Sequence, residues 1–189
     1  DINSMKRIYD VNVFPIVSVT QAFLPLLMAS KGTVVNHVGS MATLLNLPGI
    51  GVYGSSKHAA SALSNVLRLE LKPFDVGVVL LTTGVVSSEI LGENWPACEV
   101  RDASIYHPAK GEIERFFNED SGLKKGMTPE EYAKSVVGKL EGMRGSGFVY
   151  DGARIEFGRW VSWLFPWWFR DAMVLKRMGM SKIEASKEQ

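Results

Sequence analysis

The sequence predicts an α/β fold built on a parallel sheet. Three short apolar runs have the valine-rich or aromatic composition of buried parallel strands: Thr33–Val38, Val76–Leu81 and Gly147–Tyr150. Helical patterning separates each run from the next, and alternation of strands with helices is typical of a parallel sheet.

Helices are expected before and after each of these strands. The first covers Asn3–Met28 with a kink at Pro15, and the second runs from Gly54 to Lys72, where Pro73 stops it. A third covers Thr128–Leu140 and begins with Thr-Pro-Glu-Glu, in which the threonine hydroxyl caps free amides and the acids face the helix dipole.

The stretch between Ser87 and Thr128 shows little periodicity apart from one expected short helix near Glu112–Asn118. Long connections of this kind act as lids or binding segments, although a plain insertion explains the pattern equally well. We therefore describe residues 87–127 as a lid-like loop and leave both interpretations open.

The composition is that of one ordinary globular domain. The chain has 189 residues, 46% of them apolar and 22% charged, with 21 basic and 20 acidic side chains. This mixture excludes a disordered chain, and a net charge of +1 without a basic stripe argues against a nucleic-acid partner. The lone Cys98 cannot form an intrachain disulfide, which fits an intracellular location, and three scattered histidines predict no metal site.

One apolar segment, residues 11–30, contains no charged side chain. Pro15 and Pro25 interrupt it, together with several polar residues, so we expect a helix buried in protein rather than in lipid. The first ten residues carry charges, lack an initiator methionine and contain no apolar targeting run, so the chain starts as if cut from a longer one.

A glycine motif between the first two strands matches a dinucleotide-binding pattern letter for letter. Gly49, Gly51 and Gly54 form G-x-G-x-x-G, but no acid stands at the end of the next strand to hold ribose hydroxyls. The nearest acid, Asp75, precedes that strand instead of following it. We therefore expect these glycines to be turn and packing residues.

The residues that carry chemistry lie around that motif. Tyr53 and Lys57 are four positions apart and share one helical face, where an ammonium favours the ionised phenol and prepares it for acid/base chemistry. Ser40 follows the first strand, thirteen residues before Tyr53, and its hydroxyl can hold a substrate oxygen. The pair alone is weak, because a surface tyrosine packed on a lysine stem gives the same pattern.

The order of strand, Ser40, Tyr53, Lys57 and a second strand with a glycine turn resembles the C-terminal part of a short-chain dehydrogenase/reductase. The resemblance implies a Rossmann-like, doubly wound sheet and an NAD(P)(H)-dependent oxidoreductase that reduces a ketone or oxidises a secondary alcohol. Tyr53 is then the acid/base, Ser40 orients the carbonyl and Lys57 bonds the nicotinamide ribose. Asn12 matches the asparagine whose backbone carbonyl helps hold the water of a proton relay.

The same resemblance assigns cofactor contacts to six residues: Tyr53, Lys57, Thr83, Gly84, Val86 and Ser88. Ser88 takes the role of a family threonine, whereas Thr83 replaces a proline and Pro15 replaces a glycine. Nothing matches the family's N-terminal glycine-rich turn, its cofactor-selecting residue or its N-N-A-G strand end. We therefore expect an N-terminally incomplete fold of about three strands, and NADP(H) in preference to NAD(H).

Three further stretches resemble the fungal NADPH-dependent acyldihydroxyacetone-phosphate reductase branch: 127–133, 147–152 and 164–169. That likeness implies a lipid-like ketone substrate and a place in the cytoplasm or on the membrane of the endoplasmic reticulum or lipid droplets. Related ketoreductases with other substrates share much of the pattern.

An aromatic, basic extension is expected to follow the Rossmann portion, so the chain divides into 1–156 and a helical segment 157–189. Four tryptophans lie within nine residues there: Trp160, Trp163, Trp167 and Trp168. With flanking arginines and lysines, residues 157–178 suit a helix on a membrane surface or an apolar substrate entrance. A core helix or a dimer-contact helix fits the pattern equally well.

Two expectations concern the protein as a whole. The resemblance implies a homo-oligomer formed through the helices at Asn3–Met28 and Gly54–Lys72, and the strand Thr33–Val38 should leave one edge open to pairing. The alternative function is a truncated, non-catalytic remnant that acts as a dimerising or membrane-associated protein.

Overall fold

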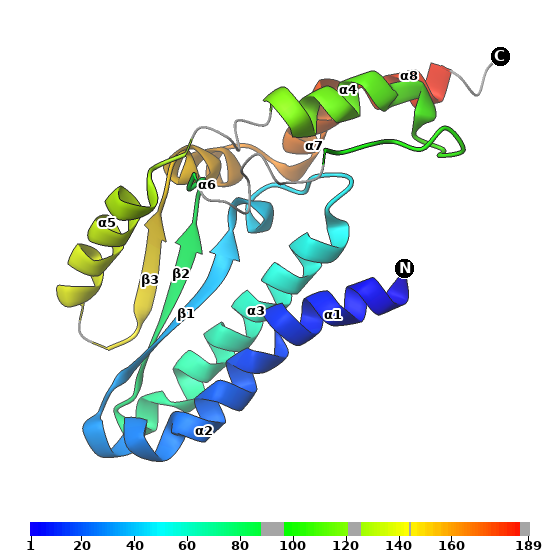
Figure 1. The fold of residues 1–189 in the computed structure, drawn as a ribbon. Coiled ribbons are helices and arrows are strands. Elements are labelled where there is room, and N and C mark those ends of the chain that lie inside the picture. The colour runs from blue at the N-terminus through cyan, green and yellow to red at the C-terminus, as the bar shows by residue number, and fades with distance from the viewer. Residues whose placement is uncertain (88–96, 121–125, 144, 186–189) are drawn as a thin grey trace.

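The computed structural model describes residues 1–87, 97–120, 126–143 and 145–185. Within them a parallel sheet has the order β1-β2-β3, formed by Thr33–Ser40, Gly77–Thr83 and Gly147–Asp151. The predicted strands and their parallel pairing are confirmed, each strand extending one or two residues past its predicted end. β2 lies in the middle, and its side chains are buried except at its last residue (Figure 1).

The register brings the carboxyl ends of β1 and β2 level. Thr33 pairs with Gly77 at one end and Ser40 with Thr83 at the other. The register shifts between Asn36 and Gly39, so β1 contains one more residue than β2 over this stretch. Such a bulge bends a strand and changes the direction of the side chains that follow it, which here include Ser40.

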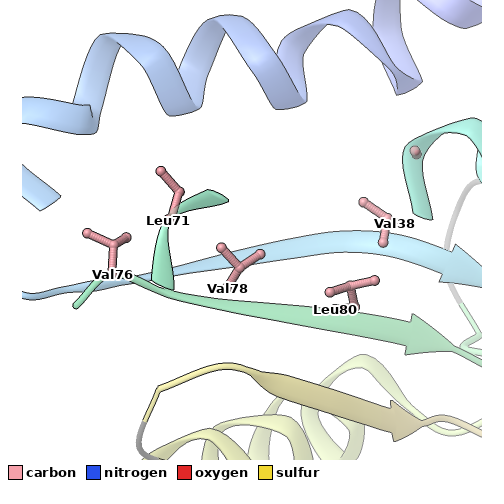
Figure 2. Packing of buried hydrophobic residues seen from close by; sticks show 6 residues of the cluster. Val38, Leu71, Val76, Val78 and Leu80 are labelled. Carbon is pink, nitrogen blue, oxygen red and sulfur yellow. The ribbon is translucent and has the colours of Figure 1, made fainter. Parts of the chain in front are cut away.

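One face of the sheet is covered by helices α2 (Phe14–Ser30) and α3 (Gly51–Glu70), and α1 (Ile2–Asn12) packs on these two helices. The expected kink is a break at Val13, and Pro15 lies in the first turn of α2, where its missing amide costs no helical hydrogen bond. The core on this face joins the sheet to α3 and the turn after it (Figure 2): Val38, Ala60, Leu71, Val76, Val78 and Leu80.

The opposite face packs against α5 (Pro129–Glu141) through a second core cluster: Val79, Leu81, Val136 and Val149. The predicted cap is present, because the Thr128 hydroxyl accepts from the Glu131 amide while the Glu131 carboxylate accepts from the Thr128 amide. Helices therefore cover both faces of the sheet, as a doubly wound fold requires.

The chain after the sheet forms α6 (Ile155–Leu164), α7 (Trp167–Arg177) and the short α8 (Ser181–Ala185). The described part of the lid-like loop packs against these helices. α4 (Lys110–Arg115) continues into a π-helical turn over Phe116–Asp120, close to the expected short helix. A third core cluster joins the two regions: Ala109, Ile113, Phe116 and Met178.

The outer edge of β1 and one side of α2 remain uncovered in the described part of the chain. Within the described residues no strand pairs with the outer edge of β1, where Val35 is 43% exposed. The helical stretch Ile2–Ser30 is long and apolar enough to cross a membrane by length and composition alone, and only 11% of its apolar window is buried. The expected burial of residues 11–30 in protein is thus not found here, because α2 packs along one side only.

Candidate active site

The site begins where β1 and β2 end. Ser40 and Thr83 are register partners on neighbouring strands, so both lie at the carboxyl edge of the sheet, where open α/β sheets bind ligands. The Ser40 hydroxyl accepts from the amide of Ala42 at 3.3 Å, and its backbone carbonyl accepts from the Thr43 hydroxyl at 2.7 Å. These bonds fix the turn that leads from β1 towards α3.

Tyr53 and Lys57 lie in the first turns of α3, which starts at Gly51, three residues earlier than predicted. The Lys57 ammonium lies 5.8 Å from the centroid of the Tyr53 ring, and the tyrosine is 38% exposed. Burial lowers the pKa of Lys57, because the surrounding protein disfavours its charged form. A Cβ built on Gly54 would lie 3.8 Å from the Ala42 carbonyl, so the start of α3 contacts the turn after Ser40.

Asn12 joins this group through its side chain. Its amide donates to the hydroxyl of Ser56 at 3.0 Å, and that hydroxyl donates to the carbonyl of Tyr53 at 2.8 Å. A second hydrogen bond joins the same two helices, from the Tyr9 hydroxyl to the hydroxyl of Ser55 at 3.1 Å. The end of α1 is therefore held against the turn of α3 that carries Tyr53.

A hydrogen-bonded cluster that sequence reasoning did not predict surrounds Thr83. Its hydroxyl lies 2.5 Å from that of Tyr132 on α5 and also bonds Nε2 of His37 on β1. The His37 and Tyr132 rings stack with centroids 6.4 Å apart. The available signal was strand alternation, which places Thr83 on the same face as Leu81 and therefore towards α5.

Two pKa shifts follow from this cluster. Partial burial lowers the pKa of His37, and the positive charge of Lys57 lowers it further. Partial burial raises the pKa of Tyr132, the bond to Thr83 opposes that change and the charge of Asp151 adds to it. Both side chains are therefore favoured in their neutral forms.

The stretch after β2 is held between two other segments. Gly84 donates its amide to the carbonyl of Asp151 at 2.7 Å, and a Cβ on it would lie 2.4 Å from the Ala153 carbonyl, so only glycine fits. Val86 bridges to Met127. Ser88, the last predicted cofactor contact, lies outside the described residues.

The glycine motif behaves as a turn, as expected. Gly49 has a φ of +90°, which favours glycine, and it lies against the ring of Phe117. This glycine therefore shapes the loop that leads into α3. Two surface hollows of about 550 and 540 Å³ lie elsewhere, one beside β3 and the other beside Glu99–Asp102.

These residues fit the nicotinamide end of a dinucleotide. An exposed phenol, a nearby ammonium and two strand-end hydroxyls offer a proton donor, a positive charge and polar anchors at the position where such folds bind nucleotides.

Comparisons with known proteins found related sequences over most of this chain. A family model described as short chain dehydrogenase matches residues 1–99. A short-chain dehydrogenase/reductase of Pestalotiopsis microspora is 34% identical over 187 residues, which cover 97% of this chain and 63% of that protein. The NADPH-dependent 1-acyldihydroxyacetone phosphate reductase of Saccharomyces cerevisiae is 28% identical over 182 residues, covering 95% of this chain and 59% of that protein.

The fold also matches solved structures. A short chain dehydrogenase from Burkholderia cenocepacia in complex with NADP aligns with a TM-score of 0.60 at 23% identity, covering 86% of this chain and 56% of that one. The predicted Rossmann-like fold is thereby confirmed. The chain spans about three fifths of the length of the two curated relatives, 63% and 59%.

Proposed function

The chain belongs to the short-chain dehydrogenase/reductase family, and we propose that it carries the catalytic residues of an NADP(H)-dependent carbonyl reductase or alcohol dehydrogenase. One observation carries the proposal: the Lys57 ammonium lies 5.8 Å from the Tyr53 ring centroid, in the turn of α3 that contacts the loop after Ser40. A proton donor, a nearby ammonium and a hydrogen-bond donor thus come from one end of the sheet.

Ser40 and Tyr53 both act on the oxygen of the ketone. The Ser40 hydroxyl donates a hydrogen bond to that oxygen and orients the carbonyl. Tyr53 gives its phenolic proton to the same oxygen as the carbonyl becomes a secondary alcohol, and the Lys57 charge stabilises the phenolate left behind. Asn12 acts through Ser56, which holds the backbone of Tyr53 in place.

The cofactor, when bound, supplies the hydride that the carbonyl carbon accepts. We propose that Tyr53, Lys57, Thr83, Gly84 and Val86 hold its nicotinamide end, and Ser88 completes this set in the sequence. NADP(H) is the proposed form, because the yeast relative is named NADPH-dependent and the Burkholderia structure contains NADP.

The substrate proposed is a lipid-like ketone, such as an acylated dihydroxyacetone phosphate. The yeast relative's name supports this choice. An assay of the complete protein with this ketone and with a short water-soluble ketone would separate the substrate class from the reaction type.

The acid/base role of Tyr53 is tested in the complete protein by Tyr53→Phe, which keeps the ring and removes the proton donor. Turnover of NADPH with a ketone should fall by roughly 10³-fold, in the range of lost general acid catalysis. Tyr9→Phe is the matched control, because that phenol bonds only Ser55 among the described residues and should leave turnover near wild type. Retained turnover in Tyr53→Phe, with an unchanged circular dichroism spectrum, would refute the assignment.

We also propose a homo-oligomer formed through α2 and α3. Large apolar side chains on their outer sides are more than half exposed: Phe14, Phe23, Val66 and Leu69. Sedimentation should show a multimer that becomes smaller in a Phe14→Ser/Phe23→Ser variant. An unchanged mass would overturn this interface.

A further inference from the structure

α6, the start of α7 and the turn between them expose an unusual concentration of large apolar side chains. Seven of them between residues 157 and 168 are 40% to 76% exposed: Phe157, Trp160, Trp163, Leu164, Phe165, Trp167 and Trp168. We call residues 157–168 the aromatic segment. Contiguous exposed apolar patches of this kind mark interaction surfaces, because leaving so many aromatic rings in water is unfavourable.

The inner side of this segment is already used to pack it on the protein. Ile155, Gly158 and Val161 are buried, and a Cβ on Gly158 would lie 3.3 Å from the Leu44 side chain. Arg170 of α7 donates to the carbonyl of Leu44 at 3.2 Å. The exposed aromatic rings are therefore not needed to pack α6 on the protein. The segment itself is fixed on the loop that follows Ser40.

The charge of the region favours a lipid bilayer over a second copy of the chain as the partner. Between residues 154 and 182 the sequence contains six basic and two acidic side chains. Arg159 pairs with Glu156 and Lys182 with Glu112, and the region still carries more basic than acidic side chains. A two-fold dimer through this region would bring two net positive surfaces together, whereas anionic headgroups would neutralise that charge. The open edge of β1 does not compete for this surface, because α6 lies at the carboxyl end of the sheet and not along the outer edge of β1 (Figure 1).

We propose that the aromatic segment docks on the surface of an anionic phospholipid bilayer. Tryptophan side chains favour the interface between headgroups and acyl chains, and flanking basic residues add electrostatic attraction. α6 has 10 residues, and at 1.5 Å per residue its length of about 15 Å is half of what a span needs, so the segment lies on the bilayer.

Docking there would hold the loop after Ser40 next to the lipid. A ketone that resides in the bilayer would then reach the candidate active site without crossing water. This consequence rests on the proposed function, whereas the docking itself does not.

The test is flotation of the full chain with vesicles of phosphatidylcholine alone and with added phosphatidylserine, which needs no turnover. We expect flotation that increases with phosphatidylserine and falls with salt. A Trp163→Ser/Trp167→Ser variant, which removes the two most exposed rings, should bind roughly tenfold more weakly. Ile105→Ser/Tyr106→Ser is the matched control, because both residues are exposed outside the segment, and it should float like wild type.

Three results would overturn the proposal. Equal flotation of wild type and the double tryptophan variant would show that the segment does not bind lipid. Loss of flotation in Phe14→Ser/Phe23→Ser alone would assign lipid binding to α2. No flotation at all, with a change of sedimentation mass in the tryptophan variant, would show that a second copy covers the segment.

Discussion

The side-chain amide of Asn12 donates to the buried hydroxyl of Ser56 at 3.0 Å and so joins the end of α1 to the first turns of α3. The same hydroxyl donates to the carbonyl of Tyr53, so one serine connects a helix break to the candidate acid/base residue. The family resemblance assigns a role to the backbone carbonyl of Asn12. In this structure its side chain also has a defined partner.

Removing that connection should destabilise the fold. Ser56→Ala deletes the acceptor of Asn12 and a donor to Tyr53 at a fully buried position, which should lower the free energy of unfolding by about 1–2 kcal/mol. Ser55→Ala is the control, since this neighbouring serine is exposed and should change stability by less than about 0.5 kcal/mol. Urea denaturation of both variants measures the difference, and equal effects would contradict the role given to Ser56.

The requirement for glycine after β2 can be tested with a matched pair. Gly84→Ala should cost more than about 2 kcal/mol, because its Cβ would meet the Ala153 carbonyl at 2.4 Å and the Gly152 carbonyl at 2.8 Å. Gly138→Ala, in the exposed middle of α5 with nothing within 4 Å, should instead stabilise by about 0.5–1 kcal/mol. Thermal unfolding distinguishes opposite signs directly, and a tolerated Gly84→Ala would disprove the close approach.

Thr83 should matter through its hydroxyl and not its shape. Thr83→Val keeps the volume and the β-branch but leaves both Tyr132 and His37 without their shared partner, so stability should fall by about 1–2 kcal/mol. Tyr132→Phe removes one of the same bonds, and the double variant should cost less than the sum of the single changes. A double-mutant cycle followed by urea denaturation tests this, and strict additivity would mean that the two hydroxyls do not interact.

Local patterns predicted most of the fold because each strand carries its own signal. Valine-rich runs, the cap at Thr128 and the interruption of a helix near Pro15 are each recognisable within a few residues. The start of α3 was missed by three residues, since Gly51 and Val52 have poor helix propensity and are held by a turn in which Gly54 donates to the Ile50 carbonyl.

Contacts between distant segments could not be read in this way. The spacing of Tyr53 and Lys57 follows from helix geometry, but the cluster of His37, Thr83 and Tyr132 depends on a sheet register and a helix docking that no local pattern encodes. The packing of α7 on Leu44 likewise joins residues 126 positions apart.

The proton equilibrium of His37 should report on this arrangement. Because the folded state lowers its pKa below 6.5, the unfolded chain binds the proton more tightly. The imidazole is therefore without effect on stability well above pH 6.5, and stability decreases as the pH falls through 6.5 towards the folded pKa. His37→Gln should reduce that decrease, as measured by urea denaturation at several pH values.

Lys57 contributes to the shift as the second cause after burial, so Lys57→Met should move the pKa of His37 back towards 6.5. Nuclear magnetic resonance titration of the His37 ring in both proteins measures this directly. Lys139→Met is the control, because its ammonium pairs with Asp151 at 2.8 Å and is not a cause of the His37 shift. A His37 pKa that stays unchanged in Lys57→Met would mean that the ammonium does not act at the carboxyl end of β1, and the geometry proposed for the active site would have to be revised.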